Sequence, residues 1–153
     1  MRPLYPSPEY EELLDFLGGV GWFPGRRTDL RPHLEVWTAC GYRAFDAARD
    51  FIAECAGIEF EYPRHSAIGG FTRAWCPGLS LPVEYRAVWW PSYEKRINRE
   101  LCPVGQSASG NVFLLMSPDG IMYGGRDWFF VKVSDDGYHA LFDISRRVRM
   151  ISV

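Results

Sequence analysis

The sequence predicts an α+β fold in which helices come first and a mainly antiparallel sheet with flanking helices follows. Apolar residues recur at helical spacing in three stretches before Gly57, and the period then changes to two. Short apolar runs separated by turn residues fill the last third, and one more helical stretch closes the chain. This order of elements is typical of the α+β class.

The first helix is predicted to begin at Ser7-Pro8-Glu9, because a side-chain oxygen, a proline and a carboxylate suit the start of a helix. Its apolar face contains Tyr10, Leu13, Leu14 and Leu17, and its acidic face contains Glu9, Glu11, Glu12 and Asp15. Gly18-Gly19 is expected to end it, since glycine accepts the left-handed conformation that closes a helix.

Two further helices are expected before the sheet. One begins at Thr28 or Asp29 and ends before Gly41, and the next runs from Phe45 to Cys55. Carboxylates recur every four residues along the latter, at Asp46, Asp50 and Glu54. This spacing suits either a solvated helix face or a site for a metal ion or acid–base chemistry, and the apolar stripe opposite favours the solvated face.

The middle of the chain alternates between apolar and polar residues. A strand is predicted over Ile58–Tyr62, and a short one over Phe71–Trp75. The alternation over Val83–Trp89 predicts a further strand, after which Ser92 is expected to cap a short helix that reaches Leu101.

The last third is predicted to be rich in strands. Val112–Met116 is a continuous apolar run, as expected for a central strand that is covered on both faces. Pro118-Asp119-Gly120 suits a turn to a hairpin partner that begins at Ile121, and Trp128–Val133 reads as another strand. Asp135-Asp136 is expected to cap the closing helix.

The chain has 153 residues, with 17 basic and 19 acidic side chains and a formal net charge of −2. This length suits one domain over residues 1–153. The charge balance argues against a nucleic-acid ligand, and the one dense basic cluster, Arg146-Arg147-Val148-Arg149, better suits the end of a helix. Because there is no membrane-length apolar run and no secretory signal, we expect a cytoplasmic protein that binds no membrane.

The residues that carry chemistry are few and widely spaced. The cysteines form no metal or redox motif, so we expect small buried thiols at Cys40, Cys55, Cys76 and Cys102. A Cys–His pair is arithmetically possible, but no cysteine lies in a nucleophile motif, and no phosphate-binding glycine loop occurs. We therefore expect no catalytic residues, no cofactor and no bound metal.

Aromatic residues, at 16% of the chain, point to a protein partner. Trp89 and Trp90 are consecutive, so on a strand they would point to opposite faces, and Trp128 and Phe129 alternate in the same way. Either helices cover both faces of the sheet, or some of this aromatic area is exposed. Exposed Trp, Tyr and Arg are enriched where interfaces concentrate binding free energy.

Three segments, taken in order, resemble the SUKH superfamily, and most closely its third family of bacterial immunity proteins. Gly21-Trp22-Phe23-Pro24-Gly25-Arg26 is similar to that family's Gly-Trp-x-Pro-Gly-Arg segment after the first helix. The stretch from Phe45 to Phe60 resembles its helix that ends at a glycine and leads into a strand. Leu101–Gly105, Leu114–Met116 and Gly120–Tyr123 are similar to its Cys-Pro-Val-Gly strand and hairpin.

The resemblance implies a non-catalytic inhibitor, namely a cytosolic antidote that is encoded beside a polymorphic toxin and binds the toxin domain, which in many cases is a nuclease or a deaminase. The implied partner is a cognate toxin domain, with no nucleic acid bound directly, and the chain would be a monomer or a weak homodimer. Two alternatives remain: a general SUKH-type adaptor in a signalling or assembly complex, and an enzyme that uses Cys or His chemistry.

We predict that aromatic and arginine side chains anchor the partner and that an acidic pair steers the encounter. These residues are Trp89, Trp90, Tyr93, Arg96, Tyr123, Arg126, Trp128, Glu59 and Glu61. The motif residues that we expect to be structural are Trp22, Arg26, Gly57, Pro103, Gly105 and Gly120. We expect Trp22 to be buried between the first two helices.

Overall fold

The computed structural model describes residues 8–64, 70–76, 83–148 and 150–153, so Ser7 and Arg149 lie outside the described residues. Its elements are α1 (Pro8–Gly19), α2 (Arg31–Cys40), α3 (Asp46–Cys55), β1 (Glu59–Pro63), β2 (Phe71–Trp75), α4 (Val83–Ile97), β3 (Cys102–Ser107), the 3-10 turn η1 (Ala108–Gly110), β4 (Val112–Met116), β5 (Met122–Arg126), β6 (Phe129–Ser134), α5 (Gly137–Ser145) and β7 (Ile151–Ser152). The predicted α+β class is confirmed.

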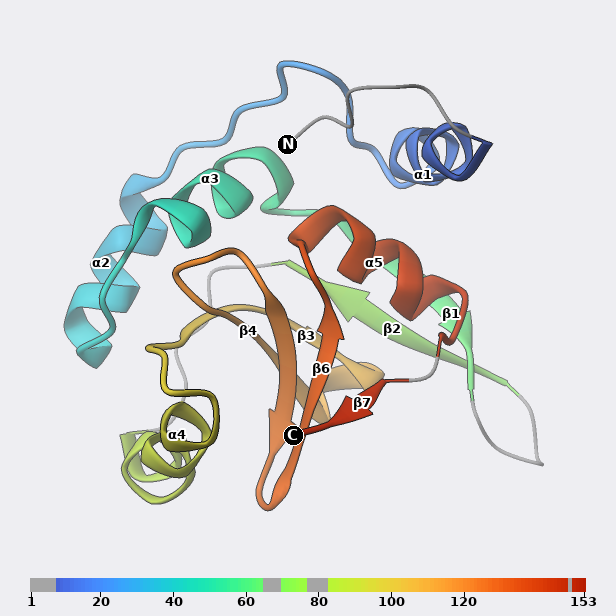
Figure 1. Ribbon diagram of the computed structural model, residues 1–153. Helices are drawn as coiled ribbons and strands as arrows, with labels where there is room; N and C mark the ends of the chain where they lie inside the picture. The colour runs from blue at the N-terminus through green and yellow to red at the C-terminus, as the bar shows by residue number, and fades with distance from the viewer. Residues whose placement is uncertain (1–7, 65–69, 77–82, 149) are drawn as a thin grey trace.

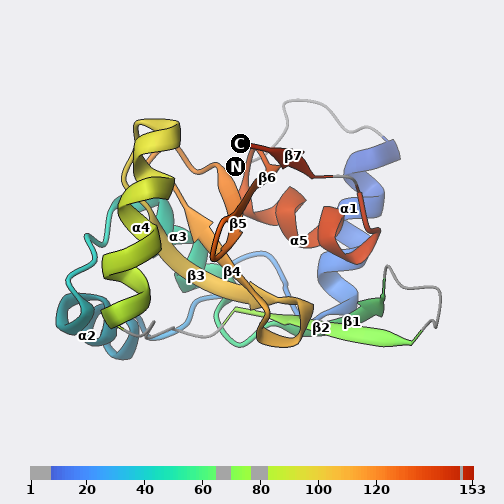
Figure 2. The ribbon, with the colours of Figure 1, turned by 90° about the horizontal axis from the view of Figure 1, so that it is seen from below.

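The strands form one antiparallel sheet in the order of the sequence, from β1 at one edge to β7 at the other. β4 lies at its centre, and its side chains from Phe113 to Met116 are buried, as the apolar run predicts. β2 joins β3 through the single pair Trp75↔Gln106. The β1–β2 hairpin therefore extends from the rest of the sheet (Figure 2).

Helices cover both faces of the sheet. Figure 1 shows α3 and α5 on one side and α4 on the other. On the α4 side, the ring of Tyr93 stacks on Phe130 at 4.5 Å between ring centroids and an interplanar angle of 7°. Gly125 permits this approach, because a Cβ there would lie 3.0 Å from the Tyr93 ring. α2 is joined to the sheet by the indole N–H of Trp37, which donates to the carbonyl oxygen of Pro103 in β3 at 2.9 Å.

The core consists of one large buried cluster and one small one. The large cluster joins α2, α3 and α4 to the sheet and includes Trp37, Ile52, Trp90, Tyr93 and Leu115. The small cluster lies where α1 meets α5 and consists of Leu13, Leu17 and Phe142. In the part of the chain that the structure describes, no helix is long and apolar enough to cross a membrane.

The strand predicted over Val83–Trp89 and the short helix predicted from Ser92 are both wrong. The structure has one helix here, α4, and Pro91 lies inside it. Two patterns overlap in this segment, and the helical one wins, because Trp90, Tyr93 and Ile97 continue an apolar stripe at helical spacing. Trp89 and Trp90 are therefore neighbours on a helix and do not alternate across a sheet.

Smaller differences have local causes. α2 begins at Arg31, after the predicted start: the Thr28 hydroxyl donates to the carbonyl oxygen of Ile52 in α3, and the Asp29 carboxylate accepts the backbone N–H of Arg31, the first residue of α2, at 3.0 Å. Trp128 lies in the turn between β5 and β6, and the strand itself begins at Phe129. The sequence pattern does not predict β7, which is only two residues long.

Candidate partner-binding site

Strand β5 connects two places where polar side chains gather. The β4–β5 turn lies at one end of this strand and the β5–β6 turn lies at the other, because consecutive strands of the sheet are antiparallel. An acid-rich cleft lies beside the first turn, and an arginine–tryptophan surface surrounds the second. The two places differ in how far their charged side chains are paired with other groups of the same chain.

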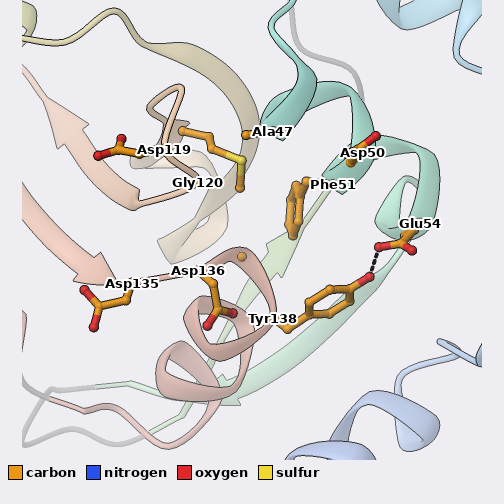
Figure 3. A pocket seen from close by; sticks show the side chains of 11 residues that line it. Ala47, Asp50, Phe51, Glu54, Asp119, Gly120, Asp135, Asp136 and Tyr138 are labelled. Carbon is orange, nitrogen blue, oxygen red and sulfur yellow. Dashed lines mark hydrogen bonds between the residues drawn. The ribbon is translucent and has the colours of Figure 1, made fainter. Parts of the chain in front are cut away.

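The acid-rich cleft has a volume of about 430 Å³ and lies between α3, the β4–β5 turn and the start of α5 (Figure 3). Its apolar lining includes Ala47, Phe51, Met116 and the ring of Tyr138. Its carboxylates are Asp50, Glu54, Asp119, Asp135 and Asp136. The residues come from three separate segments, so the sequence pattern alone does not bring them together.

Two of the cleft carboxylates stabilise α5 and its contact with α3. Glu54 accepts a hydrogen bond from the hydroxyl of Tyr138, drawn as a dashed line in Figure 3, and its other oxygen lies 3.5 Å from the Arg27 guanidinium. Burial and this bond to Glu54 raise the pKa of Tyr138. Asp136 caps α5, as predicted, by accepting the backbone N–H of His139 at 2.8 Å.

Two more carboxylates are engaged within their own turns. Asp119 accepts the hydroxyl of Ser117 at 2.5 Å and lies 3.7 Å from Arg99, and chiefly the bond from Ser117 lowers the pKa of Asp119. Asp135 pairs with Lys132 at 2.5 Å. Asp50 is exposed on α3, as the solvated-face interpretation predicts. Most of the negative charge of the cleft is therefore already balanced by the chain itself.

The cleft also depends on a close approach of α5 to α3. A Cβ at Gly137 would lie 2.3 Å from the ring of Phe51, so no larger residue fits there without a shift of that buried ring. Among the described residues, no group of three or more His, Cys, Asp or Glu side chains is arranged to hold a metal ion. Glu54 and Asp136 serve the packing of α5, and the sequence predicts the cap but not the contact between Glu54 and Tyr138.

The cysteines are placed for packing. Cys55, Cys76 and Cys102 are buried, and burial raises the pKa of each thiol, that of Cys76 to about 12. A thiol with a raised pKa holds almost no thiolate near neutral pH, and the thiolate is the nucleophile. Cys40 is half-buried. These buried thiols give no support to cysteine chemistry.

The second place is the Trp128 surface, which we define as Arg96, Arg126 and Trp128. Trp128 is 75% exposed at the tip of the β5–β6 hairpin, the orange hairpin at the bottom of Figure 1. Arg96 of α4 donates to the carbonyl oxygen of Trp128 at 3.4 Å. Arg126 donates to the carbonyl oxygen of Gly110 at 3.3 Å, which links the β5–β6 turn to η1.

The backbone beside the Trp128 surface is held in left-handed conformations. Ala108, Ser109 and Asp127 have φ values of 51°, 53° and 51°, a region that non-glycine residues seldom adopt. Hydrogen bonds hold each position: the Tyr62 hydroxyl oxygen accepts the backbone N–H of Ala108 at 2.8 Å, and the Ser109 hydroxyl lies 2.9 Å from that of Thr72. The Tyr93 hydroxyl donates to the carbonyl oxygen of Asp127.

The predicted partner-binding residues do not all reach the surface. Trp90, Tyr93 and Tyr123 are buried in this conformation: Trp90 and Tyr93 lie in the core on α4, and Tyr123 of β5 stacks on Phe130. Trp89 is half-buried, and Glu59 and Glu61 are exposed on the edge strand β1. The structure brings Arg96, Arg126 and Trp128 together, and their role in binding stays a prediction.

The residues of the Gly-Trp-x-Pro-Gly-Arg segment make internal contacts. Arg26 donates to the carbonyl oxygens of Glu54 and Ala56, both at 2.7 Å, and so caps the end of α3. Thr28, which the sequence analysis considers only as a possible helix start, adds a bond from its hydroxyl to the carbonyl oxygen of Ile52 at 3.0 Å. Trp22, which we expected to be buried between the first two helices, is half-buried and packs where α1 meets α5, at 5.5 Å from the ring of Tyr138.

The other motif residues lie in turns and in the central sheet. Gly57 and Gly120 have φ values of 86° and 83°, which glycine adopts without strain. Pro103 and Gly105 are buried in β3, where the register with β4 shifts between them.

Comparison with known proteins gives one family. The model of the SUKH-3 immunity protein family matches residues 10–143, a stretch that reaches from α1 to α5. Curated proteins and solved structures give no significant match. The matched stretch contains the acid-rich cleft, the Trp128 surface and the α3-capping Arg26. The chain therefore belongs to the SUKH-3 immunity protein family.

Proposed function

We propose that this chain, acting as one domain over residues 1–153, is an antidote that neutralises a cognate toxin domain by binding it directly. The observation that carries the proposal is the family match over residues 10–143, because immunity is the role for which the family is named. Direct contact follows from what the chain offers: an exposed aromatic and arginine surface of the kind that anchors protein interfaces.

Two features support a non-catalytic mode of action. The carboxylates of the cleft are largely satisfied by side chains and backbone groups of the same chain, so few remain for acid–base chemistry. The buried thiols of Cys55, Cys76 and Cys102 have raised pKa values. An inhibitor needs a stable surface rather than a reactive group, and these features suit one.

Charge would act mainly on the rate of encounter. The exposed carboxylates of α1, at Glu9, Glu11, Glu12 and Asp15, and those of β1, at Glu59 and Glu61, lie at the surface. We propose that they attract basic surfaces of the toxin domain, which speeds association and is weakened by salt. The net charge of −2 keeps this effect modest.

The proposal is tested with the toxin domain encoded beside the gene for this chain. Co-expression should restore the growth of cells that make the toxin domain, and the purified proteins should form a complex by size-exclusion chromatography and calorimetry. The control is a toxin domain from an unrelated locus, which should neither bind nor be neutralised.

The opposite outcome is equally clear. If the neighbouring domain is toxic but is neither bound nor neutralised, the antidote proposal fails. Stable co-purification with a housekeeping complex would then favour the adaptor alternative.

A further inference from the structure

We propose that Trp128, flanked by Arg96 and Arg126, is the anchor by which this chain inserts into an acidic recess on the toxin domain. The inference rests on the proposed function and adds the contact surface and the chemistry of the partner. The acid-rich cleft is the competing location, but four of its five carboxylates are already engaged within the chain.

The fold does not require a tryptophan at the tip of the β5–β6 hairpin. Tight hairpin turns favour small or polar residues such as Gly, Asn and Asp, because these tolerate the unusual backbone conformation. Trp128 is exposed and makes one ring contact, an edge-on approach to Phe129 at 6.5 Å. Among the tryptophans whose side chains are described, it is the only exposed one. An exposed tryptophan at this position suits a partner-binding role, because tryptophan is enriched among the residues that anchor interfaces.

The two arginines define the charge of the partner. Each donates to one backbone carbonyl, and no carboxylate of the described residues forms an ion pair with either. A guanidinium carries five N–H donors, so donors remain that suit the two oxygens of a carboxylate. Asp127 in the turn offsets part of this charge, which leaves a modest positive surface that fits an acidic rim around an apolar recess.

The surface is held in one arrangement before any partner arrives. The Tyr93 hydroxyl bonds to the carbonyl oxygen of Asp127, and Tyr93 itself is fully buried and stacked on Phe130. The Arg96 guanidinium lies 6.0 Å from the centres of both rings. A rigid anchor loses little conformational entropy on binding, so more of the contact free energy appears as affinity.

Backbone strain next to Trp128 is a second, independent indication. The pair Ala108 and Ser109 adopts left-handed conformations, which are unusual for these residues, whereas Asp127 adopts one that aspartate tolerates in turns; Arg126 bridges the two turns through Gly110. Strained residues that the surrounding structure holds in place tend to occur at binding sites, because the strain keeps a surface in its active shape. Both turns lie at the same end of the sheet as Trp128.

The first test measures the affinity of a catalytically inactivated form of the neighbouring toxin domain for variants of this chain. Trp128→Ala should raise the dissociation constant roughly thirty-fold or more, as expected for a central tryptophan anchor. The matched control is Phe23→Ala, since Phe23 is 57% exposed in the segment between α1 and α2, which lies across the sheet from the β5–β6 turn (Figure 1). This control should change the dissociation constant by less than about threefold.

The second test addresses the charge of the partner. Arg126→Gln keeps hydrogen-bond donors but removes the charge, and Arg126→Glu reverses it. Affinity should fall from wild type to Arg126→Gln and again to Arg126→Glu, and the fall should shrink at high salt. Tighter binding by Arg126→Glu would show a basic recess and overturn the inference.

The failure of this inference differs from the failure of the proposed function. If the wild-type chain binds and neutralises the toxin domain while Trp128→Ala binds as tightly, the proposed function stands and this inference is wrong. If the wild-type chain does not bind, both fail. Light scattering completes the test, because loss of self-association in Trp128→Ala with unchanged toxin binding would mean that Trp128 contacts a second copy of the chain.

Discussion

At one end of β5 the acid-rich cleft gathers carboxylates, and at the other end the Trp128 surface presents two arginines and an indole. The cleft is the more conspicuous feature, with its volume of about 430 Å³ and its concentration of charge. Its charges, however, are bound to Tyr138, Arg27, Ser117 and Lys132 of the same chain. A concentration of charge therefore does not by itself locate a binding surface.

The Trp128 surface shows the reverse arrangement. Its side chains are exposed, while the backbone beneath them is firmly held by Tyr93 and by Arg96. Substitutions in the cleft should therefore change the free energy of unfolding and leave binding unchanged, whereas substitutions at the Trp128 surface should do the opposite. The following variants test this contrast, in order of their expected effect on stability.

The largest loss of stability is expected for Gly137→Ala. The new Cβ would lie 2.3 Å from the Phe51 ring, which is buried and cannot swing into solvent. We expect the free energy of unfolding in urea to fall by roughly 2 to 3 kcal/mol. The control is Gly18→Ala, where a Cβ has no neighbour within 4 Å and helix propensity favours alanine. A neutral Gly137→Ala would show that α5 does not depend on this close contact.

A smaller loss is expected for Tyr138→Phe. It removes the hydroxyl that bonds to Glu54 and leaves that half-buried carboxylate with Arg27 alone, at 3.5 Å. The free energy of unfolding should fall by about 1 to 2 kcal/mol. A double-mutant cycle with Glu54→Gln identifies the cause, because the second substitution should add little once the bond is gone. Weaker toxin binding by the folded Tyr138→Phe variant would place the cleft in the interface.

A still smaller effect is expected at low pH. The pKa of Asp119 lies below its ordinary value of 3.8, chiefly because of the Ser117 hydroxyl. The folded state therefore favours the ionised form, so its stabilising contribution is complete above the ordinary pKa and disappears as the pH falls through the lowered one.

Asp119→Asn tests this effect. Between about pH 5 and pH 2 the wild type should lose more stability than Asp119→Asn, by less than about 1 kcal/mol since the group is half-exposed. Ser117→Ala should remove most of the same difference. Parallel pH profiles for all three proteins would show that this turn makes no such contribution.

The smallest effect on stability is expected for Trp128→Ala, the variant with the largest expected effect on binding. The turn is held by hydrogen bonds to its backbone carbonyl oxygens, and the Trp128 side chain is exposed. The free energy of unfolding should therefore change by no more than about 0.5 kcal/mol. Urea unfolding of the same samples used for binding measures it. A much larger loss of stability would show that Trp128 stabilises the fold, and the contrast between the acid-rich cleft and the Trp128 surface would then fail.

How much of this fold the sequence predicts depends on whether a segment carries one pattern or two. β2 has its predicted bounds, and Asp136 caps α5 as expected, because each segment shows a single clear signal. Val83–Ile97 shows two overlapping periods and a proline, and the alternating one misled the prediction. The spacing of apolar residues in this segment cannot decide between a strand and a helix, because the choice depends on how the segment packs against β5 and β6.

The acid-rich cleft and the Trp128 surface also differ in how far the sequence predicts them. Residue type selects Arg96, Arg126 and Trp128 as candidates, because exposed tryptophan and arginine are typical of interfaces, but it selects Trp90 and Tyr93 equally. That Trp90 and Tyr93 are buried follows from α4, which the sequence did not reveal. The cleft brings together Glu54, Asp119 and Tyr138 from distant segments, so no spacing along the chain could have predicted it.

The hydrogen bonds under the β5–β6 turn have an evolutionary consequence. Tyr93 and Arg96 bond to the carbonyl oxygens of residues 127 and 128, and every amino acid carries a carbonyl oxygen. The turn can therefore keep its shape whichever side chain stands at position 128. A lineage in conflict with a changing partner could replace that side chain, generation after generation, while the same fold goes on presenting it.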